Sequence, residues 1–352
     1  MASFIRPILC ASLLWACGGA EESTSTKSGA CTEDGRFVES NWMECAPKNE
    51  ALLSLVSPGE PGAEGLRELR YSGTSGQEEI VEVHMDMDMS MSMGPMGKVE
   101  MPLPQMRLTM NTKVLSADTD PNIRSSMEIT GGDIGEATGA LVGQEAEIRA
   151  VLQGTVGIRG ETTMTRTGRV LDGGFDVPDG APEEVKQQLK SMKQSIAQTS
   201  VPLPDEPVGP GAVWETLVRT LDEQTGMDLV VHNAVELVSW DGEKAILSYK
   251  LTQKLAPDSK LDAGGLPPGA EMEVKAFESG GSGEITLEKG LLNPRESKGD
   301  VQLSAQLLVK AQGQEMEMEM ETNVRVHLFH KDEVAPVQNE DAAESEAGVL
   351  ED

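Results

Sequence analysis

The sequence predicts a mainly β protein of the α+β class, built on a large curved antiparallel sheet or half-barrel, in one or two lobes, with two packed helices. Three observations support this fold class. Long segments alternate strictly between apolar and polar residues, which is the period of a half-buried strand. Turn-forming Gly, Pro and Asp residues separate many of these segments. Only two segments have helical periodicity, and both lie in the first 200 residues.

The first long strand is expected from Val81 to Met93, because every second residue from Val81 onward is Val or Met. The intervening positions are polar and include His84, Asp86 and Asp88. Gly94-Pro95 and a Pro-containing link should then lead to a second strand at 105–114. A third strand is expected at 123–129, followed by strands at 157–169 and 170–177.

Two helices are expected to pack on this sheet. The spacing of Leu141, Ile148 and Leu152 predicts the first helix from Gly139 to Gln153. Asp179 to Glu184 predicts a second helix start, because a Pro and two acids follow one another in the first turn. The apolar stripe of that second helix is Val185, Leu189, Met192 and Ile196.

The C-terminal half is predicted to be almost entirely strand. The expected strands are 213–223, 227–238, 244–254, 271–278, 283–288, 301–311 and 315–329. Gly280-Gly281-Ser282-Gly283 is predicted to be a turn, which removes Ser282 as a candidate nucleophile. In the last strand Met316, Met318 and Met320 share one face and four Glu residues share the other.

Charge and composition exclude several classes of partner. The chain has 352 residues and a formal net charge of -30. Such a surface repels phosphate backbones and anionic lipid headgroups, so we expect no nucleic-acid partner and no membrane contact through the protein surface. Aromatic residues make up only 3% of the chain, too few for stacking platforms.

The N-terminus predicts export. Arg6 precedes the apolar stretch from Pro7 to Ala16, which is too short to span a bilayer, and Cys17 follows directly. With Leu14 three positions before the expected cut, this segment resembles the lipobox of bacterial lipoproteins, whose Cys receives a diacylglyceryl group. The alternative is an ordinary signal peptide with an incidental Cys. Gly18 is not the Asp of an inner-membrane retention signal, so the outer membrane is favoured.

The expected domain organisation follows from these features. Residues 1–16 are a lipoprotein signal peptide, 17–50 a lipidated tether with a small disulfide loop, 51–331 a β-rich body and 332–352 a disordered acidic tail. A body with two lobes would divide near 200–212. Cys31 and Cys45 should form the disulfide, worth about 3 kcal/mol for a loop of about 15 residues, because an exported chain lies in an oxidising compartment. A redox or metal pair is the alternative, although the spacing is far from C-x-x-C.

The methionine ladders allow three interpretations. Because alternate strand residues share a face, a run of Met at every second position describes an apolar core face. It also describes the lining of a site for an apolar ligand, since Met adapts to irregular partners. A soft-metal site is the weakest interpretation, because Cu(I) needs only about three or four thioethers. The candidate lining residues are Met85, Met87, Met89, Met91, Met106, Met110, Met316, Met318 and Met320.

The remaining residues nominate no catalytic or cofactor site. Signatures such as G-x-S-x-G, H-E-x-x-H, the P-loop and G-x-G-x-x-G are absent, and only four His occur. We therefore expect no enzyme, no cofactor and no metal-ligating residues. The acidic positions Asp86 and Asp88 and the Glu ladder at 315–321 are interpreted as solvated faces, because Ca²⁺ sites need loops that wrap around the ion.

Several segments together resemble a family of uncharacterised lipoproteins from Gram-negative soil bacteria. The similar segments are the lipobox, a Met-alternating strand, the stretch from Met106 to Thr112, Val177-Pro178-Asp179-Gly180 and the closing Met-alternating strand. The resemblance covers most of residues 69–328 and implies the fold and an envelope location. That family has no established activity, so the resemblance transfers no catalytic residue.

The sequence thus predicts a lipid-anchored protein of the bacterial cell envelope, attached to the membrane through its N-terminal lipid only. The expected activity is non-catalytic binding of an apolar small molecule or an envelope protein. A purely structural surface lipoprotein is the alternative, and a Cu(I)- or Ag(I)-binding protein that uses the Met ladders is a weaker one.

Overall fold

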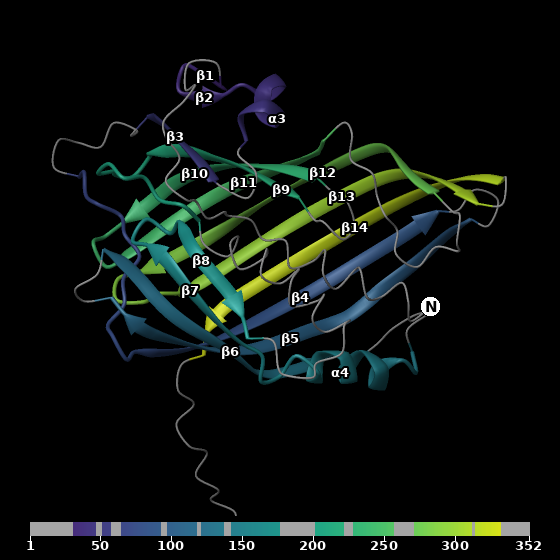
Figure 1. Ribbon diagram of the computed structural model, residues 1–352, viewed down its shortest axis with the longest axis horizontal. Helices are drawn as coiled ribbons and strands as arrows, with labels where there is room; N and C mark the ends of the chain where they lie inside the picture. The colour runs from purple at the N-terminus through teal and green to yellow at the C-terminus, as the bar shows by residue number, and fades with distance from the viewer. Residues whose placement is uncertain are drawn as a thin grey trace, which may run out of the picture.

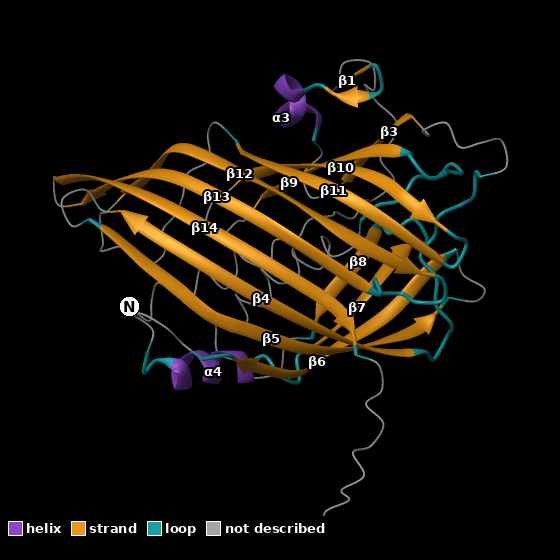
Figure 2. Cartoon of the chain, turned by 180° about the vertical axis from the view of Figure 1, so that it is seen from behind, coloured by secondary structure: helices purple, strands orange, loops and turns teal. Residues whose placement is uncertain are grey.

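A single antiparallel sheet dominates the protein (Figures 1 and 2). The computed structural model describes residues 31–46, 51–57, 65–92, 97–117, 121–136, 142–176, 201–221, 228–256, 271–311 and 314–331. Within them, twelve strands form one sheet in the order β3-β9-β10-β11-β12-β13-β14-β4-β5-β6-β7-β8. The edge strands β3 and β8 do not pair with each other in these ranges, so the sheet is open. The mainly β, curved-sheet prediction is confirmed.

The strands of this sheet are long in its centre and short at its edges. Their bounds are β3 (Ala51–Ser57), β4 (Glu78–Ser92), β5 (Lys98–Ser116), β6 (Asn122–Ile134), β7 (Arg159–Thr165), β8 (Val170–Phe175), β9 (Val213–Leu221), β10 (Asp228–Trp240), β11 (Lys244–Leu255), β12 (Glu271–Glu288), β13 (Glu296–Ala311) and β14 (Gln314–His330).

The main hydrophobic core shows that the sheet curls. It joins Trp214 of β9 and Leu247 of β11 to Val114 of β5, Ile123 of β6 and Val170 of β8, which belong to opposite halves of the strand order. Leu203, Val208 and Ala212, from the segment before β9, are fully buried in the same cluster. Strands from both halves therefore meet over one face. We call this face concave and this end of the sheet, where β4 begins, the closed end (Figure 1).

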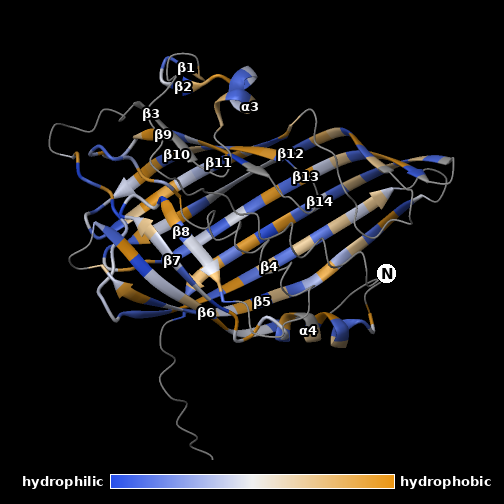
Figure 3. Cartoon of the chain, in the orientation of Figure 1, coloured by the Kyte–Doolittle hydropathy of each residue, from blue (hydrophilic) through white to orange (hydrophobic). Residues whose placement is uncertain are grey.

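The pairing register extends the concave face to the methionine strands. Tyr249 of β11 opposes Gly283, Gly283 opposes Gly299, and Gly299 opposes Val326 of β14. Val326 in turn opposes Met85 of β4, and Met85 opposes Met106 of β5. Because directly opposed residues point to the same side of a sheet, the Met side chains share the concave face with Tyr249. Figure 3 shows the resulting alternation of hydropathy along β4 and β14.

Helix α4 (Glu145–Gln153) covers part of this face. Ile148 and Leu152 pack against Met85, Met87 and Met106. The sequence predicted a helix from Gly139, and residues 137–141 lie outside the described ranges. The second predicted helix, at 183–196, lies outside them as well.

The link expected between the first two strands is instead part of β5, which begins at Lys98 and contains Pro102 and Pro104. Met85 opposes Met106 whereas Met87 opposes Leu103, so Pro104 and Gln105 together face Asp86 in a bulge. A bulge tolerates a proline because the ladder is already interrupted there and one N–H is not needed. The prediction of a link is therefore wrong from Lys98 onward, and residues 93–96 lie outside the described ranges.

The predicted turn at Gly280-Gly281-Ser282-Gly283 is also wrong, since β12 runs through it without a break. A Cβ atom on Gly281 would collide with the backbone oxygen of Asp300. One on Gly283 would collide with the oxygen of Lys298 and the hydroxyl of Tyr249. The glycines therefore allow close approach within the sheet and do not form a bend.

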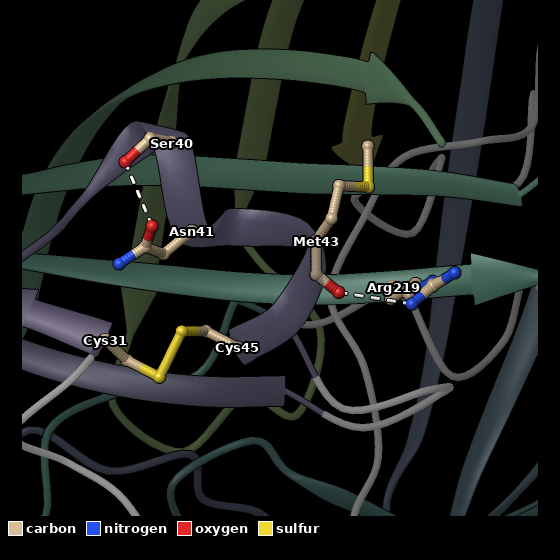
Figure 4. The surroundings of a disulfide bond; sticks show 6 residues. All are labelled: Cys31, Ser40, Asn41, Met43, Cys45 and Arg219. Atoms are coloured by element: carbon tan, nitrogen blue, oxygen red, sulfur yellow. Dashed lines mark hydrogen bonds between the residues drawn. A yellow bond between two sulfur atoms is a disulfide. The ribbon is translucent and has the colours of Figure 1, made fainter. Parts of the chain in front are cut away.

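Residues 31–46 form a small module on the other, convex face. It contains β1 (Thr32–Glu33), β2 (Arg36–Phe37), the 3₁₀ helix η1 (Glu39–Asn41) and the short helix α3 (Trp42–Cys45). Cys31 and Cys45 are disulfide-bonded with their Cα atoms 5.6 Å apart, which confirms the predicted pair (Figure 4). Phe37, Trp42 and Ala46 of this module pack against Leu217 of β9 and Val230 of β10.

Candidate functional site

The nine methionines nominated from the sequence all lie on the concave face, on β4, β5 and β14. They fall into two groups by exposure. Met85, Met87, Met89 and Met106 are buried, with exposed fractions of 5%, 2%, 5% and 6%. The half-buried group is Met91, Met110, Met316, Met318 and Met320.

Part of the ladder is plainly core. Met85, Met87 and Met106 form one cluster with Ile134 and the two apolar residues of α4. Met110 packs beside Ile129 and Ile158 in a second cluster. These contacts are enough to explain four of the nine methionines as structural residues. The interpretation of the Met face as core is correct for this part of the sheet.

A different part of the ladder lies toward the distal end, where β4 ends at Ser92 and β14 begins at Gln314. There Met91 opposes Met320 of β14, and Met89 opposes Met101 of β5. We call Met89, Met91, Met101 and Met320 the distal methionines. The sequence interpretation missed Met101 because it placed this residue in a proline-containing link. The only sequence signal for Met101 was its position two residues before Leu103, because residues two apart share one face of a strand.

Four polar side chains lie among the apolar residues on the concave face of β9 to β12. Asn233 Nδ2 donates to Thr216 Oγ1 at 3.2 Å, and Ser279 Oγ donates to Gln253 Oε1 at 2.8 Å. All four residues are buried. They were not nominated from the sequence, because each is a single polar residue in an otherwise apolar row. Amides and hydroxyls of this kind can hydrogen-bond to the carbonyl or carboxyl group of a ligand. This otherwise apolar face thus carries two polar pairs.

At the closed end, the buried carboxylate of Glu79 has a structural role. Its Oε1 accepts hydrogen bonds from Leu292 N at 2.7 Å and Gln77 Nε2 at 2.9 Å. Its Oε2 accepts from the backbone and side-chain nitrogens of Asn293, both at 2.9 Å. His330 Nε2 lies 3.5 Å away. With four hydrogen bonds accepted, this carboxylate fixes the turn between β12 and β13 to the start of β4.

The acidic ladder faces solvent on the convex side, as expected. Glu315, Glu317 and Glu319 are exposed. Glu321 is also exposed and pairs with Lys98 at 2.9 Å, and the hydrogen bond from this ammonium group lowers the pKa of Glu321. Asp88 pairs with Arg325 at 3.3 Å. In the described part of the chain, no group of three His, Cys, Asp or Glu residues is arranged to hold a metal ion.

Each histidine lies beside a carboxylate. His84 Nε2 is 2.6 Å from Glu82, and His327 Nε2 is 2.8 Å from Glu296. Both imidazole rings contact Phe329 on the convex face. The ring centroid of Phe329 lies 5.1 Å from that of His84 and 4.9 Å from that of His327. His232 lies 3.3 Å from Glu215. The histidines are thus spread over the closed end and the convex face, away from the distal methionines.

Comparison with known proteins gives no family. No family model matches the sequence. No curated protein matches it either. Among the described helices, none has the length and apolar character needed to cross a bilayer.

Three solved structures show low similarity to this chain. The OccK11 (OpdR) protein of Pseudomonas aeruginosa is 7% identical over 76% of this chain and 100% of its own, with a TM-score of 0.22. The monoaromatic hydrocarbon channel TodX is 8% identical over 74% and 91%, with a TM-score of 0.26. An outer membrane channel of Pseudomonas putida F1 is 8% identical over 77% and 99%, with a TM-score of 0.20. Scores of this size assign no activity.

Proposed function

We propose that this chain is a lipid-anchored protein of the bacterial cell envelope whose concave face binds an apolar ligand without catalysis. The observation that carries the proposal is the half-buried row Met91, Met316, Met318 and Met320 on the concave side of the sheet. A core residue is normally buried completely, whereas these side chains are enclosed on the sheet side and still reachable by solvent.

Methionine suits such a face because its unbranched, polarizable side chain adapts to irregular apolar shapes. The polar row Thr216, Asn233, Gln253 and Ser279 on the neighbouring strands would meet a carbonyl or carboxyl end of the ligand. An amphiphile with an acyl chain has both of these parts. A purely structural role is the second candidate, favoured by the complete burial of Met85, Met87 and Met106 under α4.

The proposed location in the cell envelope rests on the N-terminal sequence. The small residue before Cys17, the polar stretch after it and the resemblance to envelope lipoproteins all support an acylated Cys17. Gly18 favours the outer membrane. The net charge of -30 supports attachment by the lipid alone and argues against a nucleic-acid partner.

Binding of a fluorescent polyene fatty acid to the full chain tests the ligand proposal. The wild type should bind this probe saturably. Met318→Glu should weaken binding at least tenfold, because it places a charge on the apolar face, whereas Met318→Leu should bind normally. Glu317→Gln, on the convex face of the same strand, is the matched control. Equal binding by Met318→Glu and the wild type, or no saturable binding by the wild type, would favour the structural role.

A further inference from the structure

We propose that the distal methionines form a binding site for a soft monovalent cation, Cu(I) or its analogue Ag(I). This site shares Met91 and Met320 with the proposed apolar-ligand face but does not require that an apolar ligand binds there. Four methionines from three adjacent strands, β14, β4 and β5, occupy neighbouring register positions on the concave face.

The register brings the four side chains together. Met91 and Met320 oppose each other directly, as do Met89 and Met101. Met89 and Met91 are two residues apart on one strand and so point to the same side. Directly opposed Cβ atoms lie about 4.5–5.5 Å apart, and a Met side chain has three rotatable bonds. The sulfur atoms of Met89, Met91 and either Met320 or Met101 can therefore converge on one ion.

Packing distinguishes these methionines from the core. Met91, Met101 and Met320 are half-buried, whereas Met89, at 5% exposed, is as buried as the core residue Met85. None of the four belongs to the hydrophobic clusters formed among the described residues, whereas Met85, Met87 and Met106 do. A site of this kind is shielded by the sheet and still open to an ion from solution.

The donor chemistry selects the ion. Thioether sulfur is a soft, neutral ligand that prefers Cu(I), which needs only about three or four such ligands, and binds Mg²⁺ or Ca²⁺ poorly. Val99 opposes Met91 and Thr322 opposes Met89. Of these two neighbours, only Thr322 carries a hydroxyl group. Hard cations should therefore not compete for the site.

Charge on the opposite face favours a cation. Neutral sulfurs leave the charge of a bound Cu(I) uncompensated, so nearby carboxylates matter. Glu319 and Glu321 flank Met320 along β14, Glu100 precedes Met101, and all three are exposed on the convex side. Lys98 neutralises Glu321, which leaves Glu100 and Glu319 to add to the negative field of the whole chain.

Cu(I) titration of the full chain against a chromophoric Cu(I) chelator tests the site. Every sample carries Cys10→Ser and Cys17→Ser, because free thiolates would bind Cu(I) themselves. Ascorbate maintains Cu(I) so that no thiol reductant contacts the disulfide. We expect one tightly bound Cu(I) per chain, and at least hundredfold weaker binding by the triple variant Met89→Leu, Met91→Leu, Met320→Leu.

The matched control is Met85→Leu, Met87→Leu, Met106→Leu, which removes as many thioethers from the packed cluster and should bind Cu(I) within threefold of wild type. Leu preserves apolar area and roughly the volume, so both variants should fold, and their circular dichroism should match wild type. Wild-type affinity in the distal variant, equal losses in both variants, or no tight binding by the wild type would each overturn the proposal.

Discussion

At the scale of single residues, one buried contact holds the disulfide module to the sheet. Glu215 Oε2 accepts a hydrogen bond from Phe37 N at 2.9 Å, and His232 lies 3.3 Å away. Trp42 stacks on His232 with ring centroids 4.4 Å apart. Burial raises the pKa of Glu215, but hydrogen bonds from His232 and Phe37 and the nearby positive charges together lower it below its usual value.

This lowered pKa predicts that the module loosens in acid. A carboxylate with a depressed folded-state pKa contributes stability above its unfolded pKa, about 4.3, and loses it as the pH falls through the folded value. Protection of the Phe37 amide, measured by hydrogen exchange, should therefore fall below about pH 4.3 in the wild type. Glu215→Gln should lower that protection by about 2 kcal/mol at neutral pH and remove its acid dependence. Undiminished protection at pH 3 would exclude the carboxylate as the clamp.

At the scale of elements, strand β12 contains glycines that allow close packing and do not form a turn. Gly283 lies where Tyr249 from β11 crosses the concave face toward β13, and there is no room for a side chain. The neighbouring Ser282 is exposed on the convex face. Two adjacent positions of one strand should thus respond differently to the same substitution.

We expect Gly283→Ala to lower the free energy of unfolding by about 1–3 kcal/mol, because the new Cβ atom forces Tyr249 or β13 to shift. Ser282→Ala should change it by no more than about 0.5 kcal/mol, as for other exposed positions. Urea unfolding followed by circular dichroism measures both. Similar midpoints for the two variants would show that Gly283 is not closely packed.

At the scale of the whole molecule, the two faces of the sheet have opposite characters. The convex side carries carboxylates and the disulfide module, and the concave side carries methionines and the main core. A chain with a net charge of -30 has no electrostatic attraction to anionic lipid. The proposed attachment to a membrane must then depend on the N-terminal Cys.

Replacing Cys17 by Ala should therefore move the protein from the membrane fraction to the soluble periplasmic fraction. Two acyl signals are needed for stable anchoring, and lipidation at Cys17 would supply them. Cys10→Ala is the control, and it should leave the protein with the membranes. Fractionation with immunoblotting measures both, and an unchanged membrane fraction for Cys17→Ala would refute the lipid anchor.

The sequence by itself determined the strand-rich fold, the Met and Glu faces and the Cys31–Cys45 pair. Alternation with period two depends only on neighbouring residues, so Met85, Met87 and Met89 could be placed on one face without knowing what covers them. For the disulfide, the prediction that Cys10 lies in a signal peptide and that Cys17 is lipidated leaves two Cys, which have one pairing.

The tertiary structure alone decided which positions interrupt a strand and which methionines are core. Pro104 suggested a link, but a bulge accommodates this proline within β5. Gly283 suggested a turn, but the ring of Tyr249 leaves room only for glycine at this position of β12. Likewise, α4 buries Met85 and Met106 but leaves Met91 and Met320 half-buried. The physical reason is that register and packing join residues far apart in the chain, and local periodicity contains no information about such contacts.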